Sequence, residues 1–164
     1  MSYFSNFPSD ILKIGNEYKY VTDIFRRVYT NTFSTHYSEL ETVTIPEGYT
    51  IEQVSDLYYG SPTYHWVIMI LNNIVDIREE WPKSTTDLVE YCKLKYGGLE
   101  GLYDVHHYES DEGITVQSSY AQNKIAITNI EYEEKLNDAK REVQILEPKY
   151  LNSFVTKFQT LISR

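Results

Sequence analysis

The sequence predicts an α+β fold, because segments of two kinds follow one another along the chain. Residues 38–45 and 124–128 are rich in β-branched residues and partly alternate, as strands do. Other segments repeat their apolar residues at helical spacing, begin with capping residues and end near glycine. The 164 residues suffice to bury a core without disulfides or metals. We expect a core over 38–80, extended by helices, a small antiparallel sheet and a long C-terminal amphipathic helix.

Residues 1–37 are expected to form an N-terminal arm and a short helix that Asp23 caps and that continues to Val28. Three aromatic residues precede Pro8: Tyr3, Phe4 and Phe7. An arm with three rings needs a surface to dock against, either on its own domain or on a neighbouring protein. Because the rings lie outside any predicted regular element, we expect deletion of Ser2–Phe7 to prevent entry into the assembled complex while leaving the melting temperature nearly unchanged.

The central segment begins with the first of these strands and continues with two helices. Thr50 and Gln53 form a capping box, and Gly60 stands where the first helix ends. A proline opens the second helix, over 62–72, which is apolar nearly all round. Such a helix must be covered on more than one side. We therefore expect Trp66 to lie at the centre of the core.

The last segment, 81–164, adds helices and strands. Its predicted elements are a helix capped by Ser84 and ended by Gly97, a hairpin of 103–109 with 113–118, a strand at 124–128, a helix opened by a capping box at 128–131, a strand at 141–146 and a final helix after Pro148. On the helix after 128, Tyr132, Leu136 and Ala139 share one face. The apolar stripe of the final helix closes the core by default, and it also suits docking to a partner.

Composition and charge argue against several classes of protein. The formal net charge of −9 lacks the basic footprint of a nucleic-acid binder. No apolar run approaches the roughly 20 residues of a membrane span, and the N-terminus lacks the pattern of a secretory signal. Cys92 is the only cysteine, so we expect a packed thiol in a protein made in a reducing cytoplasm. The 16 tyrosines suit packed interfaces.

The sequence predicts no catalytic, cofactor-binding or metal-binding residue. Its carboxylates crowd into polar stretches such as 79–80 and 111–112, which are typical of solvated faces, and a Gly-x-Ser-x-Gly motif is absent. The one metal-like cluster is 104–109. On a regular strand Asp104 and His106 share one face while His107 and Glu109 share the other, which leaves two ligands a face, too few for zinc.

The central segment resembles a LysM module, a small β-α-α-β unit. The matching residues are Ile45-Pro46-Glu47-Gly48-Tyr49-Thr50, Val54, Leu57-Tyr58-Tyr59-Gly60 and Ile70-Leu71-Asn72-Asn73-Ile74. Tyr49 stands where the module usually has Asp. The usual closing strand is not found after Asn73, because 76–80 is a poor strand. Both departures argue against glycan binding.

A second resemblance runs across the whole chain. The motifs that carry it are Tyr3-Phe4-Ser5-Asn6-Phe7-Pro8, Val21-Thr22-Asp23-Ile24-Phe25-Arg26-Arg27-Val28, Tyr59-Gly60-Ser61-Pro62-Thr63-Tyr64-His65-Trp66-Val67-Ile68, Leu71-Asn72-Asn73-Ile74, Trp81-Pro82, Lys140-Arg141-Glu142-Val143 and Pro148-Lys149-Tyr150. In this order they are similar to the LysM-like baseplate wedge subunit of contractile-tailed bacteriophages.

This resemblance implies a structural protein that joins wedge subunits during baseplate assembly, without catalysis and without cofactors. It implies other wedge and tail proteins as partners, and a place in the virion tail after assembly in the host cytoplasm. The alternative is a peptidoglycan-binding LysM module that assists cell-wall penetration, although peptidoglycan is not the expected ligand. We expect partner contacts at residues of the arm and of the shared motifs: Tyr3, Phe4, Phe7, Phe25, Arg26, Arg27, Tyr64, His65, Trp66 and Trp81.

Overall fold

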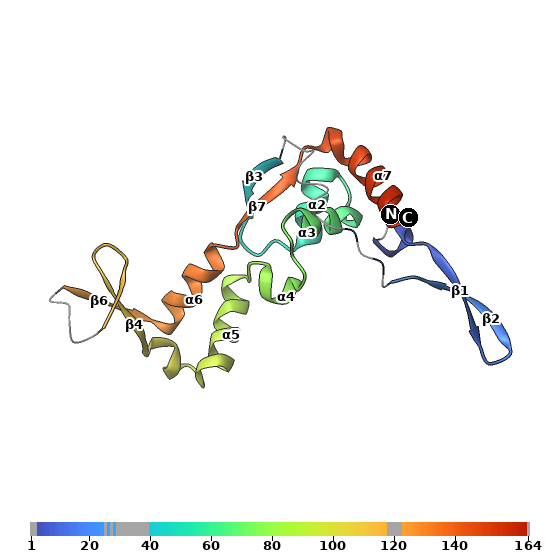
Figure 1. Cartoon of the computed structure of the whole chain (residues 1–164). Helices are drawn as coiled ribbons and strands as arrows, with labels where there is room; N and C mark the ends of the chain where they lie inside the picture. Colours follow the sequence, from blue (N-terminus) through green and yellow to red (C-terminus); the bar gives the residue numbers. More distant parts are fainter. Residues whose placement is uncertain (1–2, 25, 27, 29–39, 118–122, 164) are drawn as a thin grey trace. The chain divides into compact units, whose positions relative to one another are not determined.

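The computed structural model describes residues 3–24, 26, 28, 40–117 and 123–163, and it contains both helices and small antiparallel sheets (Figure 1). This confirms the predicted α+β class. The chain forms two compact units. Unit 1 comprises Met1–Ile45, Tyr49–Arg78 and Val143–Arg164, and unit 2 comprises Pro46–Gly48 and Glu79–Glu142.

Unit 1 is built around one apolar core. Its elements are the 3-10 helix η1 (Tyr3–Asn6), strands β1 (Ser9–Ile14), β2 (Glu17–Thr22) and β3 (Leu40–Thr44), helices α2 (Ile51–Tyr59), η2 (Pro62–Tyr64) and α3 (His65–Leu71), most of strand β7 (Glu142–Leu146), and helices η4 (Pro148–Tyr150) and α7 (Leu151–Ile162). One buried cluster consists of Phe7, Trp66, Val67, Leu146, Leu151, Phe154, Phe158 and Ile162. Further apolar residues buried in this unit are Ile45, Ile51, Val54, Ile68, Val143 and Ile145. Trp66 is 2% exposed, which confirms its predicted place in the core.

Strand β7 pairs with β3, so the strand that closes the central β-α-α unit comes from the far end of the chain. Side chains from the two helices hold β7 in place. The Asn72 side-chain Nδ2 donates to the Gln144 backbone carbonyl at 2.8 Å, and the Asn72 side-chain Oδ1 accepts from the Gln144 backbone N–H at 2.8 Å. The Tyr59 hydroxyl accepts from the Leu146 N–H at 3.2 Å. The sequence showed no closing strand after Asn73 because residues 79–142 intervene before it.

Unit 2 contains helix α5 (Thr85–Tyr96), the 3-10 helix η3 (Glu100–Tyr103), a three-stranded sheet and helix α6 (Asn129–Asp138). The sheet runs in the order β5 (Thr115–Val116), β4 (Val105–Ser110), β6 (Lys124–Thr128), and both pairings are antiparallel. The short helix α4 (Ile77–Glu80) precedes α5. Leu88, Cys92 and Leu102 form a buried cluster. Burial raises the pKa of the Cys92 thiol, in keeping with a packed cysteine.

The predicted helix ends are confirmed. Thr50 and Gln53, like Thr128 and Glu131, exchange both hydrogen bonds of a capping box. Ser84 accepts from the Asp87 N–H at the start of α5. Gly60 and Gly97 adopt the left-handed conformation that ends α2 and α5.

The N-terminal segment differs from the expected arm and short helix. Residues 9–22 form an antiparallel hairpin, β1–β2, in which Ser9 pairs with Thr22 and Ile14 with Glu17. The described residues Ile24, Arg26 and Val28 are not helical. Phe25 lies outside the described residues. The Asp23 carboxylate accepts from the Arg26 guanidinium at 3.0 Å.

The burial of the N-terminal rings argues against the expectation that deleting Ser2–Phe7 would leave the melting temperature nearly unchanged. Tyr3 lies in η1, and Phe7 is 8% exposed within the core of unit 1. Gln159 of α7 donates to the Asn6 side-chain oxygen at 2.9 Å. The arm packs on its own unit because burying two of its rings there outweighs the entropy lost in ordering it.

Helix α6 buries polar residues instead of the predicted apolar face. The buried residues are Asn129, Glu133 and Asn137, whereas Leu136 is 43% exposed. Each buried side chain is paired: Asn129 donates to the Gly101 carbonyl, Glu133 accepts from Lys95 and Tyr96, and Asn137 bonds both backbone groups of Lys83. Burial of polar groups is tolerated because every one of them has a partner.

The expected division into 1–37, 38–80 and 81–164 also differs from the two units. The C-terminal helix α7 belongs to unit 1, where it packs with η1 and Trp66. Across the parts of the chain that the structure describes, no helix has both the length and the apolarity needed to cross a bilayer.

Candidate functional site

The β1–β2 hairpin exposes a face of aromatic and aliphatic side chains. Its register pairs Ile11 with Tyr20 and Lys13 with Tyr18, so these four side chains project from the same face. Tyr18 and Tyr20 are 71% and 80% exposed. The Lys13 ammonium lies 5.9 Å from the centre of the Tyr18 ring. This face therefore offers two tyrosine rings and a cation to solvent.

The opposite face of the hairpin is exposed as well. Leu12 and Ile14 are 51% and 57% exposed, and Val21 is 38% exposed. Within the described residues, the only ion pair on this face joins the Lys19 ammonium to the Glu17 carboxylate at 3.6 Å. A two-stranded hairpin with neither face covered is marginal in water, and exposed apolar patches mark interaction surfaces. The hairpin is thus a candidate partner-binding element (Figure 1).

The sequence analysis missed this hairpin, although a local signal was present. The pair Gly15-Asn16 stands between two runs that alternate apolar and charged residues, and Gly15 adopts a positive φ of 65°. Gly-Asn between alternating runs is a hairpin signature. The aromatic motif before Pro8 drew the interpretation towards an arm instead.

The aromatic residues of η1 form a second exposed feature of unit 1. The Tyr3 ring centre lies 4.9 Å from that of Phe7 and 5.8 Å from those of Trp66 and Phe158. Phe4 is 55% exposed. A cavity of about 350 Å³ is lined by Tyr3, Phe4, His65, Trp66, Met69, Ile70 and Ile74. It therefore brings together four of the ten residues expected at a partner interface.

The remaining expected interface residues lie elsewhere. Phe7 is buried in unit 1, and Tyr64 is half-buried with its ring centre 6.3 Å from that of Tyr59. Arg26 donates to the Ile162 carbonyl at 3.2 Å. Trp81 is 6% exposed and belongs to unit 2. Phe25 and Arg27 lie outside the described residues.

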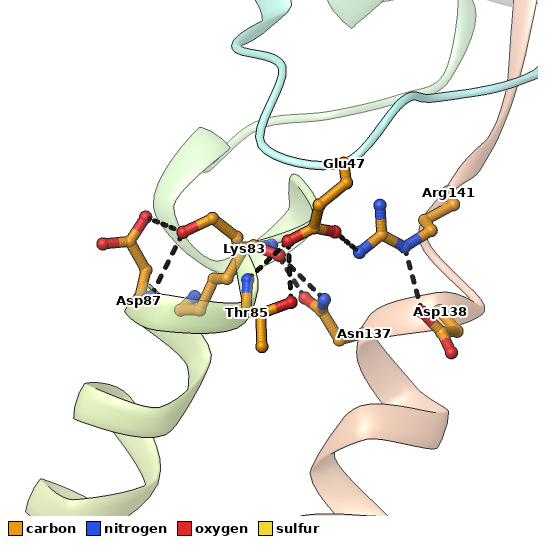
Figure 2. A network of polar contacts seen from close by, with 8 residues as sticks. Glu47, Lys83, Thr85, Asp87, Asn137, Asp138 and Arg141 are labelled. Carbon is orange, nitrogen blue, oxygen red and sulfur yellow. Dashed lines mark hydrogen bonds and ion pairs between the residues drawn. The ribbon is translucent and has the colours of Figure 1, made fainter.

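A polar network in unit 2 surrounds Glu47 (Figure 2). One carboxylate oxygen accepts from the Thr85 N–H at 2.6 Å and from the Thr85 hydroxyl at 2.8 Å. The other accepts from the Arg141 guanidinium, which also donates to Asp138 at 2.9 Å. These contacts lower the pKa of Glu47 to about 2. The largest cause is the hydrogen bond from the Thr85 backbone N–H, followed by those from the Thr85 hydroxyl and Arg141. The network fastens residues 46–48 to the start of α5.

The two histidines of β4 lie side by side. A bulge between Val105 and His107 breaks the strict alternation, so the Nδ1 atoms of His106 and His107 lie 2.9 Å apart. This corrects the expectation that they face opposite ways. His107 lies 3.1 Å from Glu109, and the His106 ring stacks on Tyr132 at 3.9 Å. No group of three or more potential ligands occurs within the described ranges.

Comparison with protein families finds a match over most of the chain. A family model described as base plate wedge protein 53, from phages, matches residues 5–123, which is well over half of the chain. The matched range covers the β1–β2 hairpin, helices α2 and α3, and most of unit 2, and it begins after Tyr3 and Phe4. No curated protein sequence matches the chain.

Proposed function

Because the chain belongs to the family of phage base plate wedge protein 53, a structural component of the virion tail baseplate, we propose that it joins wedge subunits to one another as the baseplate assembles. The observation that carries this proposal is the β1–β2 hairpin, whose apolar side chains are exposed on both faces. An element of this kind is stabilised when a neighbouring protein covers it.

Burial of the exposed side chains of the hairpin would supply part of the binding free energy of such a joint. Full burial of a large apolar side chain contributes roughly 1.5–3 kcal/mol. Covering Ile11, Tyr18 and Tyr20 therefore contributes several kcal/mol to the binding free energy. Because association costs about 4–15 kcal/mol in lost translational and rotational freedom, further contacts must add to it. Tyrosine is also enriched at the centres of interfaces.

The second contact surface in this proposal is the surface around the cavity that residues of η1 and α3 line. Tyr3, Phe4 and His65 line its cavity, and Tyr64 and Arg26 are also partly accessible. Phe7, Trp66 and Trp81 are buried within their units, so their contribution is to hold the neighbouring elements in shape. The proposed role requires neither catalysis nor a cofactor, and it places assembly in the host cytoplasm before the contractile tail is completed.

The hairpin can be tested by complementation of a phage that lacks this protein. We replace Tyr18 and Tyr20 together by serine, and we use Tyr103→Ser as the control because Tyr103 is also 68% exposed but lies in unit 2. The proposal expects the double variant to fold with a melting temperature within about 3 °C of the parent, since it loses no buried contact. It should fail to enter baseplates, whereas the control enters. Normal incorporation of the folded double variant would contradict the proposal.

The second candidate function is binding of peptidoglycan. This candidate is supported by the succession of β3, α2, α3 and β7 in unit 1, which is the β-α-α-β order expected of a LysM module, with residues 79–141 preceding the last strand. An open groove of about 470 Å³ runs along α2 and is lined by Tyr49, Glu52, Gln53, Asp56, Leu57 and Pro62. Saturable retention on purified peptidoglycan, lost in Tyr49→Ala, would support this function. If the protein is not retained on peptidoglycan, this second function is rejected and the proposed role as a structural joint stands.

A further inference from the structure

The outer edge of strand β2 is open to a further strand. The Asp23 N–H donates to the Pro8 carbonyl at 2.9 Å, which fixes the alternation of the hairpin ladder. By this alternation the odd-numbered residues of β2 direct their backbone groups toward β1, whereas Tyr18 and Tyr20 direct theirs outward. Among the described elements, none lies beside β2 on that outer side (Figure 1). Such an edge is a template for a strand of another chain, and a third strand would stabilise the hairpin.

Symmetry limits how two copies of this edge can pair. A twofold axis perpendicular to the sheet leaves the same face of both copies on the same side. Residues directly opposite each other must therefore both be odd-numbered or both be even-numbered. Near the middle of β2 the axis can pass at Tyr18, Lys19 or Tyr20. The charged residues of β1, Asp10 and Lys13, point to opposite faces, so no symmetric pairing of β1 brings them together.

Two of the three registers of β2 are unfavourable. An axis at Lys19 places the ammonium groups of both copies directly opposite each other, and like charges in that position repel. An axis at Tyr20 places Glu17 of one copy opposite Asp23 of the other. It also needs the Thr22 carbonyl as an acceptor, although this carbonyl already accepts from the N–H two positions further along at 3.0 Å.

The register with its axis at Tyr18 is complementary in charge. It places Glu17 of each copy opposite Lys19 of the other, at a non-hydrogen-bonded position where cross-strand side chains lie closest. Within one copy the same two side chains lie 3.6 Å apart and are 76% and 58% exposed, so pairing closes a ring of alternating charges. On the other face the two Tyr18 rings meet, and each is 71% exposed in the single chain.

We propose that two copies of this chain join through their β2 edges, with Tyr18 on the twofold axis, into one continuous antiparallel sheet. Outward backbone groups of Tyr18 and Tyr20 supply hydrogen bonds, and the charge pairs of Glu17 with Lys19 fix the register. The proposal names a partner for the β1–β2 hairpin, and it rests on the proposed function for its place in the baseplate.

Charge reversal tests this pairing in the isolated full chain, with the dimer dissociation constant measured by sedimentation equilibrium. Glu17→Lys and Lys19→Glu should each weaken the dimer at least about tenfold, because each places like charges opposite each other twice. An equimolar mixture of the two variants should form a heterodimer within about threefold of the parent affinity, although neither variant regains its in-chain ion pair. The control Lys93→Glu breaks an exposed ion pair of unit 2 and should leave the dimer unchanged.

Cysteine substitutions report the register directly. The native Cys92 is buried, so an introduced cysteine is the accessible thiol. Opposite Cα atoms of a hydrogen-bonded pair lie about 5.5 Å apart, within the range that a disulfide spans. Tyr18→Cys should therefore link two copies rapidly under mild oxidation. Tyr20→Cys and Tyr103→Cys, whose parent side chains are 80% and 68% exposed, should not.

The outcomes separate this contact from the proposed joint. A parent chain that stays monomeric at its highest soluble concentration would overturn the proposal, and so would a mixture of charge variants that associates no better than either alone. Preferential linkage through Tyr20→Cys would also contradict it. A hairpin that is required in the phage experiment while the chain stays monomeric would reject the dimer and keep the joint. A charge-dependent dimer whose hairpin is dispensable in the phage would keep the dimer and reject the joint.

Discussion

Replacing Phe7 by alanine separates a docked N-terminal segment from a free one. Phe7 is 8% exposed and belongs to the core cluster of Trp66 and Phe158, whereas Phe4, three residues earlier, is 55% exposed. Truncation of a buried phenylalanine to alanine costs about 3–5 kcal/mol. Because the Phe7 side chain is not completely buried, we expect the low end of this range, about 3 kcal/mol. Phe4→Ala loses less than half as much burial and should cost about 1 kcal/mol or less.

The measurement must report on unit 1 alone. The chain has two tryptophans, Trp66 in unit 1 and Trp81 in unit 2, so the comparison is made in a Trp81→Phe background and unfolding in urea is followed by Trp66 fluorescence. The difference between Phe7→Ala and Phe4→Ala should be about 2 kcal/mol. Equal midpoints for the two variants would refute the reasoning, because they would show that the Phe7 ring is not part of the core in solution.

Three further changes test other parts of the structure. Among the described residues the indole N–H of Trp66 has no acceptor, so Trp66→Phe should lower the free energy of unfolding in urea by only about 1 kcal/mol. Trp66→Ala should lower it by about 3–5 kcal/mol, and an equal cost for both variants would argue against a packed indole. A Cβ at Gly101 would lie 1.9 Å from the Tyr96 carbonyl oxygen, so Gly101→Ala should destabilise unit 2 by more than about 3 kcal/mol, followed by Trp81 fluorescence. The pKa of Glu47 is lowered from 4.5 to about 2, so its stabilising contribution is full above pH 4.5 and is lost as the pH falls towards 2. Since the side chain is 50% exposed, Glu47→Gln should cost only about 1 kcal/mol at pH 7, and this difference from the parent should vanish near pH 2 in thermal unfolding scans.

The sequence by itself determined the local elements of this protein. A capping box needs two residues three positions apart, and a left-handed helix end needs one glycine, so Thr50 with Gln53 and Gly97 are sufficient signals. The same holds for the β4–β5 hairpin and for the apolar stripe of α7. The β1–β2 hairpin is specified locally as well, since Gly15-Asn16 forms its turn between the paired residues Ile14 and Glu17.

Only the tertiary structure decided which polar groups are buried and what they meet. Glu47 meets Thr85 and Arg141 across 38 and 94 positions of the chain, and β3 is closed by a strand that follows the whole inserted segment 79–142. The polar face of α6 is buried because Lys95 and Tyr96 are available to pair with Glu133. Helical periodicity cannot show such pairings, since the cost of burying a carboxylate depends on donors that other elements bring to it.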